Sequence, residues 1–293
     1  MNTDNELYRY VPNVHFELIP IKDLVSNQDY QRNLSMIHVR KTAEQFNLYQ
    51  INPVKVSRRD GVNFVFNGQH TIETVALVSG SRETPVWCMI YDDMDYRVEA
   101  DVFANQQKCV KPLSPYEIFM ANIEADNELQ TAIKALVESY GLTIGKAKAP
   151  GVICAVSSLE LIYRNYGFHV LDRSLRLCAG TWEGDPNSLC SGILKGIAKL
   201  VIAYGDDLKD DVFKEKVGAY SSREICRTAR ERRAGATGYA EAMLIAYNYK
   251  SRRGLDQVRL YDGKKKKSAA PDDAEHTEDV AVNEEYQQET LDY

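Results

Sequence analysis

The sequence predicts an α+β protein in which a small domain with a mixed sheet precedes a domain made only of helices. Three short runs rich in β-branched and aromatic residues lie in the first third of the chain, and one of them leads directly into a helix. After Ser114, helical periodicity recurs as far as Leu260, with glycines beyond several expected helix ends. A chain of 293 residues has room for two such domains.

We expect four segments along the chain. They are a lead-in at 1–13, a mixed-sheet domain at 14–125, a helical domain at 126–260 and a disordered charged tail at 261–293. The tail holds ten acidic residues against four lysines, a surplus of six that equals the net charge of −6 of the whole chain. It is too polar to bury a core, and the rest of the chain is close to neutral. The acidic balance therefore does not exclude a polyanionic partner.

The mixed-sheet domain begins with an alternating pattern. Apolar residues from Val14 to Leu18 alternate with polar ones, which predicts a strand that Pro20 ends. Ile21–Leu24 fits a short helical turn. Ser35 is a candidate N-cap for the helix that follows.

A hairpin and a third strand come next. Pro53–Val56 and Val62–Phe66 are short apolar runs, and Asp60–Gly61 between them is typical of a tight hairpin turn. Pro85–Tyr91 is the clearest strand of the chain, and Tyr96–Ala104 predicts a helix that ends shortly afterwards.

The stretch that suggests a function is the turn Gly68-Gln69-His70-Thr71. Asn67 and Gly68 break the second strand of the hairpin, and from Thr71 apolar residues recur at helical spacing until Gly80. Such a strand-to-helix turn presents backbone N–H groups at a helix N-terminus, where amides and the helix dipole favour an anion. A plain connection that binds nothing is an equal alternative from the local pattern alone.

The helical half opens with Ser114-Pro115-Tyr116-Glu117, a capping box with proline at the first helical position. Gly145–Gly151 is expected to be a flexible hinge and a possible domain junction. The expected helices are Tyr116–Ala125, Leu129–Tyr140, Ile153–Tyr166, Leu189–Tyr204, Ser222–Arg233 and Tyr239–Tyr249.

The order of these elements resembles the ParB N-terminal-like superfamily, which includes sulfiredoxin. The resemblance covers about a third of the chain, and two further segments, Ile19–Leu24 and Tyr30-Gln31-Arg32, resemble members from phages and mobile elements. The Asn-Gly-Gln-His sequence is similar to an Asp-Gly-Gln-His-Arg signature. The matching motifs are Gly68–Thr71, Pro85–Tyr91, Asn105–Lys108 and Ser114–Glu117.

The resemblance implies a nucleotide, CTP or ATP with Mg²⁺, and slow triphosphate hydrolysis as a possible activity. It also implies a protein that associates with DNA in a phage or mobile element. Arg32 is expected to reach the same anion, with a surface salt bridge as the alternative. The residues that would bind the nucleotide are Asn67, Gly68, Gln69, His70, Thr71, Asn105 and Lys108.

Five substitutions set this chain apart from its relatives. Thr71 replaces an arginine that binds phosphate in relatives. Lys108 also replaces an arginine, which keeps the positive charge but loses the bidentate hydrogen bonding of a guanidinium group. Asn67 replaces an aspartate, and Ala104 stands where ParB proteins have a glutamate, which weakens the case for hydrolysis. Gln69 stands where sulfiredoxin has its catalytic cysteine, so sulfiredoxin chemistry is not expected.

Several roles remain open at this turn. His70 could donate a hydrogen bond or a positive charge to phosphate, or it could cap the helix. Glu73 could bind Mg²⁺ through water or be solvated. Asn105 and Lys108 could meet the nucleotide or form a polar helix end.

A second basic feature lies in the helical half. Arg223, Arg227 and Arg230 follow at i, i+4 and i+7, and Arg233 comes shortly after them, so this stripe could neutralise DNA phosphates. Glu224 and Glu231 interleave with the arginines, so an intrahelical salt-bridged face is the competing interpretation.

The remaining composition indicates a cytosolic protein. No apolar run approaches membrane-spanning length, and the polar N-terminus does not suggest a signal peptide. The six cysteines form no CxxC pair and are expected to be reduced core thiols, and no metal site is expected from the spacing of cysteines and histidines. A non-catalytic DNA-binding or interaction module is the alternative function. A nuclease is the weaker alternative, because no clustered carboxylates indicate a two-metal site.

Overall fold

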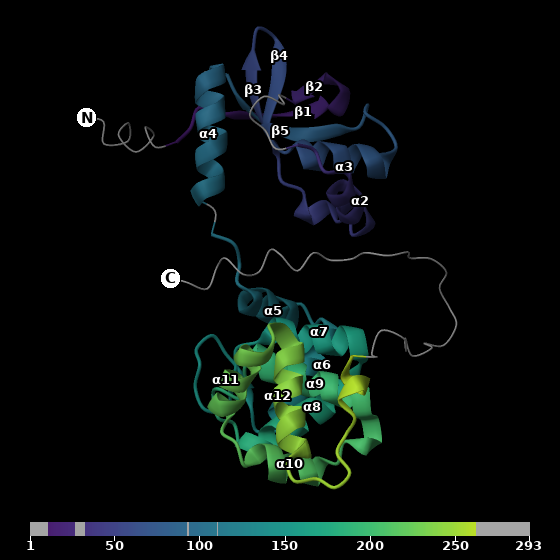
Figure 1. The fold of residues 1–293 in the computed structure, drawn as a ribbon. Coiled ribbons are helices and arrows are strands. Elements are labelled where there is room, and N and C mark those ends of the chain that lie inside the picture. The colour runs from purple at the N-terminus through teal and green to yellow at the C-terminus, as the bar shows by residue number, and fades with distance from the viewer. Residues whose placement is uncertain (1–10, 27–32, 93, 110, 262–293) are drawn as a thin grey trace, which may run out of the picture. The chain divides into compact units, whose positions relative to one another are not determined.

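A computed structural model describes residues 11–26, 33–92, 94–109 and 111–261, with the backbone alone for 107–109. The chain divides into two compact units, Met1–Pro112 and Leu113–Tyr293, which we treat separately (Figure 1). The first unit contains a mixed sheet with helices and the second is built mainly from helices, so the predicted α+β class is confirmed.

The sheet of the first unit has five strands in the order β1-β5-β3-β4-β2. Two pairs, β1–β5 and β3–β4, are antiparallel, whereas β3–β5 and β2–β4 are parallel, which makes the sheet mixed as expected. The strands are β1 (His15–Pro20), β2 (Leu24–Ser26), β3 (Val54–Arg59), β4 (Val62–Asn67) and β5 (Pro85–Tyr91).

The hairpin between β3 and β4 turns at the two residues that the sequence indicated. Asp60 and Gly61 both have left-handed backbone angles, with φ of 50° and 75°. A two-residue hairpin turn that follows the twist of its strands needs positive φ at both positions, which explains the Asp-Gly sequence. The turn pairs Arg59 with Val62 and so fixes which β4 side chains face each side of the sheet.

Helices cover both faces of this sheet. The apolar face carries Val56, Val65 and Ile90, and it packs against Ile72 and Val75 of α3 (Gln69–Ser79). Alternate residues of β3 point to the other face, where they meet α4 (Tyr96–Cys109). The remaining helical elements of the unit are η1 (Ile21–Asp23), α2 (Met36–Glu44) and η2 (Leu48–Gln50).

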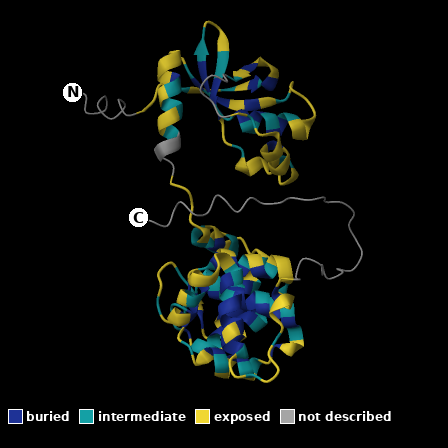
Figure 2. Cartoon of the chain, in the orientation of Figure 1, coloured by how far each residue is buried: buried dark blue, intermediate teal, exposed yellow. Residues whose placement is uncertain are grey.

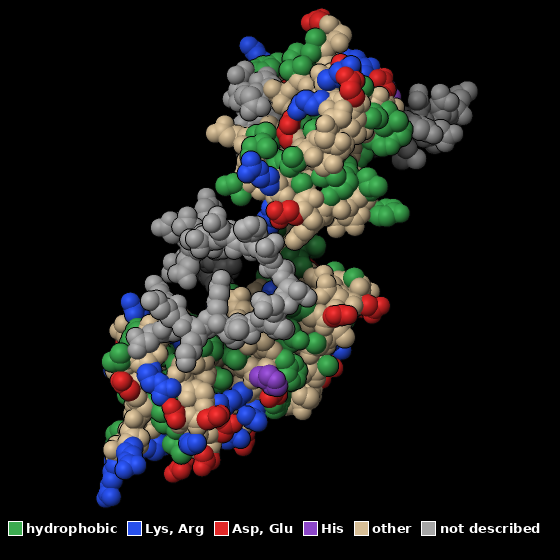
Figure 3. All heavy atoms as spheres, turned by 90° about the vertical axis from the view of Figure 1, so that its right-hand side faces the viewer, with side chains coloured by type: hydrophobic (Ala, Val, Ile, Leu, Met, Phe, Trp, Pro, Cys, Tyr) green, Lys and Arg blue, Asp and Glu red, His purple; other side chains and the backbone are tan. Residues whose placement is uncertain are grey.

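Part of the surface of the first unit is apolar. Ile37 of α2 is 83% exposed, and Leu48 and Tyr49 of η2 are also exposed. Hydrophobic side chains are visible over this unit in Figure 3.

The second unit packs around α9, whose buried residues include Ile193, Ile197 and Leu200 (Figure 2). Gly196 lets α12 approach closely, because a Cβ at this position would lie 2.8 Å from Tyr239 Cβ. The helices are α5 (Pro115–Glu124), α6 (Glu128–Ser139), α7 (Val156–Tyr166), α8 (Phe168–Trp182), α9 (Ser191–Tyr204), α10 (Asp210–Gly218), α11 (Ser222–Arg232) and α12 (Gly235–Asn248), with η3 (Gly205–Asp207) and η4 (Gln257–Leu260).

The division between units differs from the expected boundary after residue 125. Phe119 of α5 is fully buried in the core of the second unit, so this helix belongs to that unit. The expected hinge at Gly145–Gly151 also lies inside the second unit, between the paired strands β6 (Thr143–Ile144) and β7 (Val152–Ile153). No helix among the described residues is both long and apolar enough to cross a bilayer.

Two helices of the second unit were not predicted, and two boundaries differ. The missed helices are α8 and α10. The α4 helix runs on to Cys109, so the Asn105–Lys108 motif lies within the helix and not beyond its end. The α12 helix begins at Gly235 and not at Tyr239 as expected. The expected lead-in at 1–13 and tail at 261–293 lie almost wholly outside the described residues.

Candidate functional site

The predicted strand-to-helix turn is present, and a glycine stands at the start of α3. Gly68 is the N-cap of α3 with a left-handed φ of 112°, and it has no side chain to cap the helix. A Cβ at this position would lie 3.2 Å from Val54 Cγ1 and 3.3 Å from its Cα, so the turn lies directly on β3. The backbone conformation and the close packing both favour glycine here.

His70 connects the N-termini of two helices. Its Nε2 atom accepts a hydrogen bond of 3.2 Å from the backbone N–H of Ser35, the N-cap of α2. Its ring also meets the ring of His38 edge-on at 5.4 Å between centroids. An accepting Nε2 belongs to a neutral imidazole whose proton is on Nδ1. In this arrangement His70 holds α2 to α3 and brings two positive helix-dipole ends together.

The segment of α4 that resembles the ParB motif lies beside this turn. The Asn67 side-chain amide, at the end of β4, donates a 3.3 Å hydrogen bond to Gln106 Oε1. Asn105 is exposed on the same helix, and Thr71 is half-buried in the first turn of α3. The fold thus brings Asn67 next to Gln106. The side chain of Lys108 and the whole of Arg32 lie outside the described residues.

A buried ion pair positions α4 on the sheet. Glu99 is fully buried and forms an ion pair with Arg59 at the end of β3. The Arg59 guanidinium also lies 4.3 Å above the ring of Phe64 on β4. A buried carboxylate needs such a partner, because desolvation of an unpaired charge is costly. No local pattern in the sequence predicted this contact.

Glu73, the open candidate for Mg²⁺, is paired with a cation. Both of its carboxylate oxygens accept hydrogen bonds from Arg82, at 3.0 and 2.9 Å. Among the described residues, no three or more His, Cys, Asp and Glu side chains form a group that could hold a metal ion.

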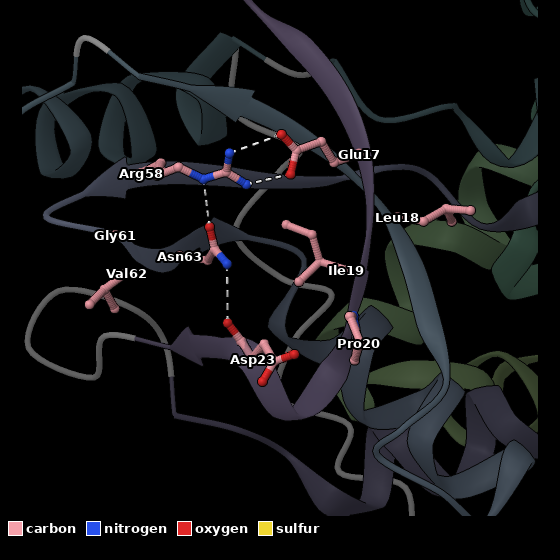
Figure 4. Close-up of a pocket in the computed structure, with 9 residues that line it drawn as sticks. All are labelled: Glu17, Leu18, Ile19, Pro20, Asp23, Arg58, Gly61, Val62 and Asn63. Atoms are coloured by element: carbon pink, nitrogen blue, oxygen red, sulfur yellow. Dashed lines mark hydrogen bonds and ion pairs between the residues drawn. The ribbon is translucent and has the colours of Figure 1, made fainter.

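A separate polar hollow of about 540 Å³ lies at the opposite end of β4 (Figure 4). Arg58 of β3 donates to both oxygens of Glu17 at 2.9 and 2.6 Å, and to Asn63 at 2.9 Å. The hydrogen bond from Arg58, aided by one from His15, lowers the pKa of Glu17 to about 2. The carboxylate of Glu17 neutralises Arg58, which makes this hollow a poor anion site.

The arginine stripe of α11 is exposed. In the described part of the chain, none of Arg223, Arg227, Arg230 and Arg233 forms an ion pair. Glu224 was one of the two expected salt-bridge partners of these arginines. It instead accepts hydrogen bonds of 2.9 and 2.8 Å from the N–H and hydroxyl of Ser221 in a capping box. The Ser221 hydroxyl and N–H lower the pKa of Glu224 and keep it ionised at the helix start.

Comparisons with known proteins give one family and a distant structural likeness. The solved structures that resemble the chain include the C-terminally truncated chromosome-partitioning protein ParB from Caulobacter crescentus, complexed with CTP-γ-S. The likeness covers 78% of this chain and 98% of that chain, with 13% identity and a TM-score of 0.33, and at that level it carries no argument about a ligand. No curated protein matches the chain. A family model matches residues 25–259, and the chain therefore belongs to the family of unknown function DUF6551.

Proposed function

We propose that this chain is a ParB-like nucleotide-binding protein that holds the phosphates of CTP or ATP at the turn between β4 and α3. The observation that carries the proposal is the contact between His70 and Ser35, which joins the N-termini of α3 and α2 at one place. Two helix starts and a glycine turn together supply backbone N–H groups and positive dipole ends, the features that bind phosphate. The proposal also rests on the ordered motifs that resemble the ParB superfamily.

Each residue of the turn has a distinct role in this proposal. Gly68 allows the phosphates to approach the backbone, and the amides of Gln69, His70 and Thr71 donate to phosphate oxygens. The Thr71 hydroxyl adds a donor, although it lacks the charge of the arginine found in relatives.

The α4 segment and the metal complete the proposed site. Lys108, one helical turn beyond Asn105 on α4, supplies positive charge to the phosphates, and Arg32 adds to it. Mg²⁺ enters with the nucleotide, and hydrolysis, if it occurs, is slow.

Thermal unfolding with CTP or ATP and Mg²⁺ tests the proposal. A ligand at about 100 times its Kd stabilises a protein by about 2.7 kcal/mol, which gives a clear rise in Tm. We expect His70→Ala and Lys108→Ala to lose most of that rise, while His38→Ala and Lys111→Ala, which remove similar groups nearby, keep it. Thr71→Arg is expected to increase the rise, because it restores a charge-assisted phosphate contact. No rise with any nucleotide would contradict the proposal.

We further propose that the second unit binds DNA through α11, as a protein of a phage or mobile element would. The observation that favours this is that Arg223, Arg227, Arg230 and Arg233 form no ion pairs within the described residues. The four exposed guanidinium groups, on α11 and at its C-cap, could each neutralise a phosphate and release counterions.

Affinity for duplex DNA, measured over a range of salt concentrations, tests this second role. Loss of one phosphate contact in Arg227→Ala should reduce the slope of log K against log salt by about 0.9. Arg164→Ala on α7, where Arg164 pairs with Glu160, is the matched control and should leave the slope unchanged. Binding that persists without nucleotide supports the non-catalytic alternative, whereas equal affinities of both variants and the native chain would exclude α11 as the contact.

A further inference from the structure

A basic loop follows α12 in the second unit. Residues 249–254 connect α12 to the segment that leads into η4 (Figure 1), and they include three cations and no carboxylate. Lys250, Arg252 and Arg253 are all exposed, and within the described part of the chain none of them forms an ion pair. The loop therefore presents positive charge that remains open to a partner.

A single side chain closes the base of this loop. Asn248, the last residue of α12, donates a 2.8 Å hydrogen bond to the Leu255 carbonyl and accepts one of 2.8 Å from the Leu255 N–H. Gly254 packs against this amide, because a Cβ there would lie 2.9 Å from Asn248 Cγ. Lys250 takes a left-handed φ of 50°, and the Ser251 N–H donates to the Asn248 carbonyl at 3.0 Å. The backbone that carries the cations is thus fixed before a partner binds, which reduces the entropic cost of binding.

A fourth cation reaches the loop from α10. Lys216 Nζ donates a 3.1 Å hydrogen bond to the Tyr249 carbonyl, and it too forms no ion pair among the residues that the structure describes. An ammonium group has three N–H donors, so Lys216 can also bind a partner. The carboxylate of Asp256, just beyond the loop, caps η4 by accepting from the Val258 N–H at 3.0 Å.

An exposed aromatic side chain stands at the start of the loop. Tyr249 is 57% exposed, and Lys250 Nζ lies 5.3 Å from the centroid of its ring. Tyr247, two residues earlier, is instead buried in the core, and its hydroxyl accepts from the Lys209 N–H at 3.0 Å. The ring of Tyr249 is therefore the one that can stack on a base while neighbouring cations bind phosphates.

This loop and the arginine stripe of α11 are separate surfaces. The α11 helix leads into the N-terminal end of α12, whereas the loop follows the C-terminal end. A helix of 14 residues such as α12 is about 21 Å long. In a duplex the faces of the bases are hidden in the stack, so an exposed tyrosine among backbone-binding cations fits a strand whose bases are unpaired.

We propose that residues 249–254, together with Lys216, bind single-stranded DNA. A base stacks on Tyr249, and successive phosphates contact Lys216, Lys250, Arg252 and Arg253. Asn248 is a positioning residue, because it holds the loop and does not touch the strand. This site goes beyond the duplex contact proposed for α11 and does not depend on it.

Fluorescence anisotropy of the full chain with a labelled single-stranded oligothymidylate, over a range of salt concentrations, tests the proposal. Each phosphate contact on a single strand contributes about −0.7 to the slope of log K against log salt, so Arg253→Ala should reduce the slope by about 0.7. Tyr249→Ala should weaken binding about ten-fold and leave the slope unchanged, because it removes stacking and no charge. Tyr249→Phe keeps the ring and should bind as the native chain does.

Two control variants remove similar groups elsewhere on the second unit. Arg164 pairs with Glu160, and Tyr166 at the end of α7 is 49% exposed. Arg164→Ala and Tyr166→Ala should leave both the affinity and the slope unchanged.

A further variant tests whether the loop must be held in place. Asn248→Ala keeps every charge but releases the base of the loop, so it should lower the affinity without a change in slope. The exposed Tyr249 and Arg253 decide the matter even where this variant fails to fold.

The test also separates this site from that of α11. Arg227→Ala should weaken binding to duplex DNA and leave binding to the single strand unchanged, so either proposal can fail without the other. The proposal would be overturned if the native chain did not bind the oligothymidylate. It would equally be overturned if Tyr249→Ala and Arg253→Ala bound it with the native affinity and slope.

Discussion

The Nε2 atom of His70 accepts a 3.2 Å hydrogen bond from the backbone N–H of Ser35. This contact joins residues that are 35 positions apart and ties the first turn of α3 to the N-cap of α2. The same Ser35 caps α2 through its hydroxyl, which accepts from His38 N–H at 3.3 Å. The backbone N–H and the hydroxyl of Ser35 therefore both fix the start of α2. His70 is the partner that α3 provides for the N–H.

Removal of the His70 acceptor should loosen α2. His70→Ala leaves the Ser35 N–H without its partner, and loss of a hydrogen bond of this kind costs about 1 kcal/mol. Hydrogen exchange of α2 amides, measured without nucleotide, should become faster in His70→Ala. His38→Ala keeps the Ser35–His70 bond and is the control. Equal exchange in the two variants would show that the bond does not hold the helix.

Replacement of Gly68 should destabilise the first unit more than replacement of Gly61. Both glycines have positive φ, but a Cβ at Gly61 meets nothing within 4 Å, whereas one at Gly68 meets Val54 at 3.2 Å. Gly61→Ala should cost about 1–2 kcal/mol through backbone strain alone. Gly68→Ala should cost more, because the added Cβ would also meet the Cα of Val54, and this backbone atom is held in the sheet. Chemical denaturation that gives equal losses for both variants would contradict the close packing of the turn.

Local signals explain the parts of the fold that could be predicted. The capping box of Ser114 and Glu117 starts α5 as expected, and Asp60–Gly61 forms the hairpin turn with both residues at positive φ. The N-caps Gly167 and Lys209 make no side-chain cap, so no polar signal marks the start of α8 or α10. The predicted helices α7, α9 and α12 lack a side-chain cap too, so this absence alone does not explain the two missed helices.

Contacts between distant residues explain what the sequence could not predict. The hydrogen bond of Ser35 to His70 and the ion pair of Arg59 with Glu99 each join separate elements. No periodicity or spacing encodes such pairs, because each depends on how helices pack in three dimensions. The motif behind the proposed nucleotide site is local in sequence, whereas the Ser35–His70 contact beside it is not.

Loss of the Glu99 charge should release α4 from the sheet. Glu99→Gln leaves the Arg59 guanidinium, which is only 21% exposed, without its counter-ion. Breaking a buried pair in this way costs about 3–5 kcal/mol. Glu73→Gln breaks the more exposed pair with Arg82 and should cost at most about 1 kcal/mol. The denaturation midpoint of Glu99→Gln should therefore be lower than that of Glu73→Gln. Similar midpoints would mean that the Glu99 charge does not stabilise the buried Arg59.

Acid should weaken the first unit through Glu17. The Arg58 hydrogen bonds, with His15, lower the pKa of Glu17 from 4.5 to about 2, so the folded state binds this proton less readily than the unfolded chain. The stabilisation is therefore complete above pH 4.5 and is lost as the pH falls towards 2. Glu17→Gln cannot ionise, and its stability should change less than that of the native chain over this range. A lowered pKa of Glu17 in the folded state makes the Tm of the native chain fall more steeply with acid than that of Glu17→Gln. Parallel profiles of Tm against pH for the two proteins would therefore show that Arg58 does not stabilise the carboxylate.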